Sequence, residues 1–206
     1  MLLDSQGYIR VTDFGLSKMG VKGNKEAKSV CGTPEYLAPE ILFKLGHGKP
    51  VDWWTLGAIL YEMITGLPPF YTTNREELFE KIKFGQLKYP AYITSNCRSI
   101  MENLFQKNPE KRLGFNGAKE VKSHPWFVNV NWKALISKEV KPPFIPVIKS
   151  PLDVGNFADE FIEEPIDSFQ DKFNIESVHN NYLNFSYNGE AKEMIKGPAQ
   201  DKGDLE

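Results

Sequence analysis

The sequence has few cysteines and histidines and no long apolar run, and each scarcity excludes a class of protein. Cys31 and Cys97 cannot form a disulfide framework, and neither a C-x-x-C pair nor a histidine cluster offers metal-ligand spacing. No stretch approaches the roughly 20 apolar residues that span a bilayer, and the N-terminus lacks the basic and apolar regions of a secretory signal. We expect an intracellular, cytoplasmic protein without a transmembrane segment or a nucleic-acid partner, with the nucleus left open.

The net charge of −2 conceals an uneven distribution. Residues 151–206 hold thirteen Asp and Glu against four Lys, a balance of −9, whereas residues 1–150 carry +7. On electrostatic grounds we expect the acidic residues 151–206 to lie on the basic residues 1–150. A solvated acidic tail that contacts nothing is the alternative.

The pattern of apolar residues predicts a mainly helical domain after a short hairpin. β-prone runs at residues 2–4 and 8–12 surround a turn and lead to Asp13. Residues 16–36 are polar and without periodicity, which is typical of a loop. A helix should follow with Asp52 as its N-cap, and it should be buried because nearly every face is apolar. Further helices are predicted at residues 75–84, 95–107, 118–123 and 132–137.

Two short motifs carry the functional information. Asp13-Phe14-Gly15 is followed, beginning twenty-five residues later, by Ala38-Pro39-Glu40, and Cys31-Gly32-Thr33-Pro34-Glu35-Tyr36-Leu37 runs directly into the second motif. Such a pair frames the activation segment of a protein kinase, in which the Asp holds Mg²⁺ on ATP. On these residues the chain resembles the AGC group of serine/threonine kinases, of which it covers the later half.

The resemblance implies a mainly α fold: a protein-kinase C-lobe that begins with a short β-hairpin and continues into an extended, largely irregular AGC tail. Residues 1–127 would be the C-lobe and 128–187 the tail. Residues 188–206 are predicted to be disordered, because charges and a Gly-Pro pair dominate them.

On the nucleotide side, the resemblance assigns Mg²⁺ and ATP as cofactors. Asp13 would bind the metal, Phe14 would pack to set the position of that Asp, and Gly15 would allow the turn. An ordinary Asp at a strand end is the alternative for Asp13. Leu2 and Thr12 would line the adenine site. Phe157 would belong to the tail segment that crosses it.

On the regulatory side, Ser29 stands where AGC kinases carry their activating phosphosite. A phosphate there would order the loop against a basic partner, for which Lys18 is our expectation, and it implies an upstream activating kinase. A loop serine that is never phosphorylated is the alternative. In the tail, Ser168 resembles the turn-motif site. Ser186 lies in a segment that resembles the hydrophobic motif, and these tail signals favour the protein kinase B and serum/glucocorticoid-regulated branch.

On the substrate side, Thr33 would lie beside the substrate hydroxyl. Val30, Pro34 and Leu37 would form the pocket for the residue after the target serine. Protein substrates would carry basic residues before the target Ser or Thr.

Three acids and one arginine complete the set of expected site residues. Glu35 and Glu62 would read the arginines of the substrate, because carboxylates bind guanidinium groups through paired hydrogen bonds. A helix cap and a partly buried helix acid are the alternatives for these two. Glu40 and Arg112 match the ion pair that anchors the activation segment, which is a structural role.

Several motifs that the family needs are missing from the sequence: the Gly-rich loop, the paired Lys and Glu, and the catalytic loop. The resemblance places Met1 immediately after the catalytic-loop Asn. We therefore expect a fragment of a kinase that transfers the ATP γ-phosphoryl group to Ser or Thr, inactive by itself. The alternative is a noncatalytic binding or regulatory fragment that uses its substrate groove or its tail.

Overall fold

The computed structural model describes residues 1–163 and divides the chain into two units, residues 1–149 and the segment from Ser150 onward. The expectations for Ser168, Ser186 and residues 188–206 lie outside the described residues. The fold is mainly helical with a two-stranded antiparallel sheet at the N-terminus, as predicted. None of the helices in residues 1–163 is both long and apolar enough to cross a lipid bilayer.

The hairpin consists of β1 (Leu2–Leu3) and β2 (Ile9–Arg10), with Leu2 opposite Arg10 and Leu3 opposite Ile9. Both strands are shorter than expected because Asp4 organises the turn from within. Its Oδ1 accepts hydrogen bonds from the backbone N–H groups of Gln6 and Tyr8, and its Oδ2 pairs with Arg10. The Tyr8 bond is the main cause of a lowered pKa of the Asp4 carboxyl.

The segment that follows the last helix of the first unit packs back onto this hairpin. The Tyr8 hydroxyl donates to the carbonyl oxygens of Lys138 and Val140 at 2.7 and 3.2 Å. Gly7 has a φ of +87°, and a Cβ there would overlap the carbonyl oxygen of Phe144. Only glycine therefore fits at this point of the turn.

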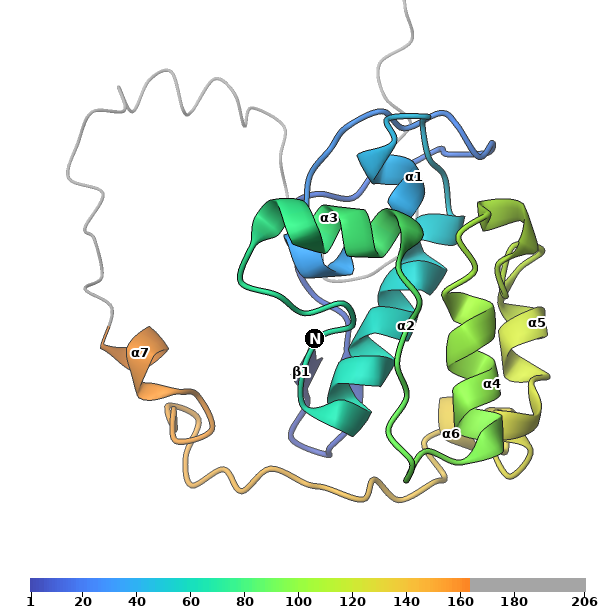
Figure 1. Ribbon diagram of the computed structural model, residues 1–206. Helices are drawn as coiled ribbons and strands as arrows, with labels where there is room; N and C mark the ends of the chain where they lie inside the picture. The colour runs from blue at the N-terminus through green and yellow to red at the C-terminus, as the bar shows by residue number, and fades with distance from the viewer. Residues whose placement is uncertain (164–206) are drawn as a thin grey trace, which may run out of the picture. The chain divides into compact units, whose positions relative to one another are not determined.

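Two antiparallel helices, α2 (Pro50–Thr65) and α4 (Ser95–Leu104), form the centre of the first unit (Figure 1). Gly57 allows their close approach, since a Cβ there would lie 3.0 Å from the Cβ of Leu104. Smaller elements surround this pair: η1 (Pro34–Tyr36), α1 (Pro39–Leu42), α3 (Arg75–Phe84), η2 (Pro109–Lys111), α5 (Ala118–Lys122), η3 (Pro125–Phe127) and α6 (Trp132–Ile136). The second unit contains α7 (Asp159–Ile162).

The start of α2 corrects one prediction. Asp52 is not the N-cap, because the helix begins two residues earlier at Pro50, with Lys49 in the cap position. Proline suits the first helical position because its fixed φ is already helical and its missing N–H would have no intrahelical partner there. Asp52 instead lies in the first turn. There its carboxylate is favourable to the positive end of the helix dipole.

The predicted burial of α2 also holds for only part of its surface. Trp54, Gly57, Ala58 and Leu60 are buried, whereas Met63 is 69% exposed. Helix α3 has the predicted bounds, whereas α4, α5 and α6 end one to three residues earlier than predicted. Helix α4 stops at Leu104 because the chain turns at Phe105, whose ring packs edge-on against Trp54 with centroids 5.0 Å apart.

His124 caps η3, the short helix that packs on α4. The Nδ1 of His124 accepts a hydrogen bond from the N–H of Trp126 at 3.2 Å, and Nε2 lies 3.2 Å from the Ser99 hydroxyl oxygen. Because Nδ1 accepts, the neutral ring carries its proton on Nε2. Burial lowers the pKa of His124.

We predict that this cap fails in mild acid. A histidine whose pKa is lower in the folded state contributes stability that is complete above its unfolded pKa, about 6.5, and is lost as the pH falls through the folded value. In His124→Asn the amide oxygen can still accept from Trp126, as asparagine caps do at α3 and α6. Urea unfolding at about pH 7.5 and 5.5 should show a larger loss in the parent than in the variant. Equal losses would contradict this role of His124.

Candidate functional site

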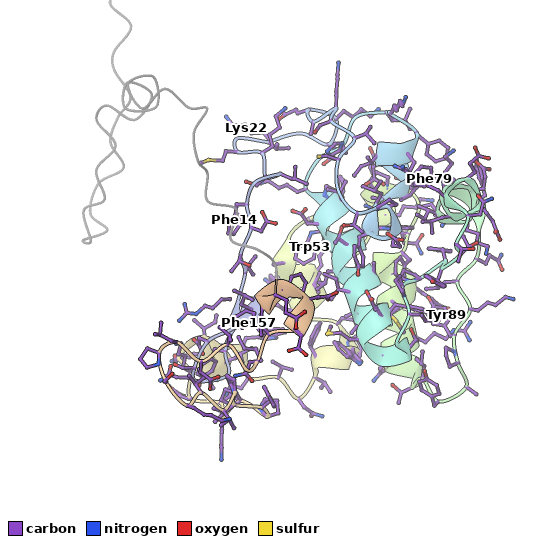
Figure 2. The ribbon with its side chains drawn as sticks, turned by 90° about the vertical axis from the view of Figure 1, so that its left-hand side faces the viewer. Phe14, Lys22, Trp53, Phe79, Tyr89 and Phe157 are labelled. Atoms are coloured by element: carbon purple, nitrogen blue, oxygen red, sulfur yellow. The ribbon has the colours of Figure 1, made fainter. Side chains whose placement is uncertain are left out.

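The Asp13-Phe14-Gly15 motif follows β2 on an exposed, irregular stretch. Asp13 has a φ of +62°, a left-handed conformation that Asp tolerates better than most residues, and its Oδ1 accepts from the N–H of Gly15 at 3.3 Å. The ring of Phe14 is 65% exposed within residues 1–163, so the packing expected from the resemblance stays a prediction. Figure 2 shows Phe14 and Lys22 on this irregular segment and Trp53 on α2.

The carboxylate of Asp13 fits the ligand chemistry of Mg²⁺. Within residues 1–163 its Oδ2 has no hydrogen-bond partner, and no three His, Cys, Asp or Glu side chains gather so that they could hold a metal by themselves. Magnesium commonly binds through one or two carboxylates, with phosphate oxygens and water completing its shell. One free carboxylate oxygen suits that mode.

The residues expected at the adenine site lie in the N-terminal hairpin region and in the second unit. Leu2 lies in β1 and is 52% exposed, and Thr12 is an exposed residue after β2. No hydrogen bond in the described chain joins either of them to Asp13. Phe157 belongs to the second unit, where its N–H donates to the carbonyl of Val154 at 2.9 Å.

Ser29 lines a cavity of about 220 Å³ together with Lys18, His47, Lys49 and Asp52. Two backbone hydrogen bonds, of 3.0 and 2.8 Å, join Ala27 to His47 and hold the loop against the approach to α2. Lys18, the expected partner of a phosphate, therefore shares a cavity with Ser29. The sequence argument missed His47 and Lys49, because only the Ala27–His47 bridge brings them beside the loop.

Asp52 is the acidic residue that lines this cavity, and its environment favours the protonated form. Asp52 stays accessible to solvent, yet the surrounding protein raises the pKa of its carboxyl through desolvation, while His47 opposes that shift. Two lysines and a histidine face this one carboxylate. The cavity is thus suited to an anion with several acceptor oxygens.

Glu35 and Glu62 lie on either side of Tyr36. The Tyr36 hydroxyl donates to Oε2 of Glu62 at 2.6 Å, and Thr55 of α2 donates to the carbonyl of Tyr36 at 3.2 Å. The bond to Glu62, with help from burial and from the charges of both acids, raises the pKa of Tyr36 to about 12. Tyr36 was not expected to have a role. It holds Glu62 through a hydrogen bond and is influenced by the charges of both acids.

Glu40 and Arg112 form a buried, two-pronged ion pair, with Nη1–Oε1 and Nη2–Oε2 distances of 2.7 and 2.9 Å. The remaining N–H groups of Arg112 donate to the carbonyls of Gln106, Pro50 and Lys107. Glu40 is 5% and Arg112 1% exposed, and they are the only charged residues classed as buried among residues 1–163. The pair joins α1, just after the substrate-side segment, to the loop after η2.

Two family models match this chain. Residues 1–127 match the family model of the protein kinase domain, and residues 148–187 match that of the protein kinase C terminal domain. The chain therefore belongs to the protein kinase family, and its relatives are kinases of the AGC group.

Three of these relatives are serine/threonine kinases of fungi and an animal. The chain is 46% identical over 189 residues to serine/threonine-protein kinase gad8 of Schizosaccharomyces pombe, covering 91% of this chain and 33% of gad8. It is 42% identical over 201 residues to YPK1 of Saccharomyces cerevisiae, covering 96% and 30%. It is 44% identical over 196 residues to Sgk1 of Macaca fascicularis, covering 91% and 46%. The chain thus spans less than half the length of these relatives.

We predict that Arg112→Met lowers the free energy of unfolding by about 3–5 kcal/mol, because it leaves the Glu40 carboxylate buried and unpaired. Adding Glu40→Gln should restore part of the loss, since the buried charge is then removed. Urea unfolding of the single and double variants measures both effects. Arg98→Met, which breaks an exposed pair with Glu102, is the matched control and should change stability far less. A loss at Arg112 no larger than at Arg98 would contradict the anchoring role.

Proposed function

We propose that this chain is the C-terminal lobe and tail of a serine/threonine kinase whose complete form transfers the γ-phosphoryl group of ATP to Ser or Thr in basic protein segments. One observation supports this most strongly. The Asp13 and Glu40 motifs bound a single segment, and the buried Arg112 fixes its second end. The residues proposed to contact substrate lie just before that fixed point.

The residues of this chain have distinct roles in the proposed reaction. Asp13 holds Mg²⁺, which when bound offsets negative charge on the phosphates. Gly15 fixes the rotamer of Asp13 through its N–H, which leaves the second carboxylate oxygen free. Thr33 lies beside the substrate hydroxyl, and Val30, Pro34 and Leu37 accept the next side chain. Leu2, Thr12 and Phe157 contact the base when the kinase is complete.

A preference for basic substrates rests on Glu35 and Glu62. Both carboxylates act on the same tyrosine, so they create negative potential in one place at the edge of α2. An arginine side chain can bind such acids through charge-assisted, paired hydrogen bonds. The hydroxyl of Tyr36 keeps one oxygen of Glu62 occupied and thereby limits the direction from which an arginine can approach.

Regulation is proposed at Ser29. A phosphate carries about −1.5 to −2 charges and three acceptor oxygens. Lys18, Lys49 and His47 line the cavity where these oxygens would lie. Phosphorylation by an upstream kinase would therefore tie the loop to the approach of α2.

A second candidate function for these 206 residues is the binding of protein partners without catalysis. The segment from Thr33 to Glu40 is anchored within residues 1–149 alone, so a peptide groove can exist without the upstream motifs. In either case we propose an intracellular location, in the cytoplasm or the nucleus.

We expect the 206 residues alone to transfer no phosphate, because the catalytic base and the phosphate-binding loop are not among them. Radiolabel transfer from ATP to a basic peptide should be absent for this chain. A longer polypeptide that includes the upstream motifs should be active and should lose at least about 10²-fold activity in Asp13→Ala. Transfer by the 206-residue chain that Asp13→Ala abolishes would contradict the prediction for the chain alone. An inactive longer polypeptide would contradict the proposed function.

In the longer polypeptide, Ser29→Ala is expected to reduce activity by about tenfold or more after treatment with an upstream kinase, because the ordering phosphate is lost. Peptide phosphorylation measures the effect, and circular dichroism checks the fold. Ser123→Ala is a control for the loss of an exposed hydroxyl away from the cavity. Equal activity of Ser29→Ala and the parent would exclude this regulation.

A further inference from the structure

A second cavity beside the activation segment has an apolar floor. It has a volume of about 240 Å³ and lies between the residues that follow Ser29, helix α1 and helix α3. Leu37 and Ile41 are buried at its floor, and Phe79 of α3 is half-buried at its side (Figure 2). The space suits one bulky apolar side chain.

Three cations line the same cavity: Lys44, Arg75 and Lys83. Lys83 pairs with Glu80 at 3.1 Å, so its charge is largely compensated. Arg75 lies over the Phe79 ring, 5.4 Å from its centroid, and forms no ion pair within the described chain. Lys44 forms none there either. Two uncompensated cations therefore border an apolar recess.

Within residues 1–163 no acid lines the cavity, and two of the three acids of α3 are already bound to lysines. Glu77 is bound to Lys81 at 2.7 Å, and Glu80 is bound to Lys83. Glu76, exposed in the first turn of the helix, is the remaining acid of α3. A net positive rim remains around the recess. Such a rim selects negatively charged partners and speeds their association.

We propose that this cavity binds an acidic peptide segment, with one bulky apolar side chain in the recess and neighbouring carboxylates on Arg75 and Lys44. Charge complementarity selects this occupant over a basic or purely apolar one. Val30 and Leu37 belong both to this cavity and to the proposed substrate pocket, so the inference rests in part on the proposed function. It adds that partners carry acids next to the apolar residue, in addition to the basic residues proposed to bind Glu35 and Glu62.

Fluorescence anisotropy of the full 206-residue chain tests this without ATP. The probe is a short fluorescein-labelled peptide that contains one phenylalanine followed by glutamates. A matched peptide carries glutamines instead, and a third replaces the phenylalanine by alanine. We expect the acidic peptide to bind, the other two to bind about tenfold more weakly, and the acidic peptide to lose affinity as salt is raised.

Variants locate the site. Arg75→Gln and Lys44→Asn should each weaken binding of the acidic peptide about threefold to tenfold. Asparagine is chosen because Lys44 has a φ of +56°, which asparagine adopts readily. Lys119→Gln, which neutralises a lysine of α5 outside this cavity, is the matched control and should bind normally. Circular dichroism confirms that each variant is folded.

No saturable binding, equal binding of the glutamine peptide, or an equal loss in Lys119→Gln would overturn the proposal. Because no phosphoryl transfer is measured, these outcomes leave the proposed kinase function standing. Conversely, an inactive longer polypeptide together with acid-dependent binding here would remove the kinase proposal and keep the docking site.

Discussion

The ion pair between Glu40 and Arg112 is the interaction on which the rest of the first unit depends. The guanidinium uses all its N–H groups, two on the carboxylate and the others on backbone carbonyls from three places in the chain. A buried charge is tolerated only when it is paired and hydrogen-bonded in this way. Because Glu40 follows Leu37 by only three residues, the same pair fixes the end of the segment between Asp13 and Glu40.

Two aromatic rings lie against the neighbouring cations Arg112 and Lys107. Its guanidinium lies 5.2 Å from the ring of Trp54, and the Lys107 amine lies 5.0 Å from Trp54 and 4.4 Å from Phe70. Burial, with repulsion from Arg112, lowers the pKa of Lys107 to about 8. The two rings provide negative faces for two neighbouring cations. Trp54 is thus both the centre of the core and part of the electrostatic support of the anchor.

The activation segment separates its charges by sign. Glu35 and Glu62 act on Tyr36. Lysines and a histidine line the cavity of Ser29. Uncompensated cations border the recess between α1 and α3. One short segment therefore contacts three electrostatic environments, and the buried Glu40 and Arg112 pair keeps its end fixed while the other parts stay accessible to partners.

The sequence by itself determined the hairpin, the main helices and the kinase family, because these depend on local patterns and on motifs with fixed spacing. It predicted the bounds of α3, which Asn74 caps by accepting from two N–H groups. It misplaced the start of α2, because proline at the first helical position outweighed Asp52 as a cap signal. Only the tertiary structure brought His47 and Lys49 beside Ser29, placed Tyr36 against Glu62, and left Lys44 and Arg75 without an ion pair to any of residues 1–163. Those relations join residues far apart in the chain, and no local periodicity encodes which distant side chains meet.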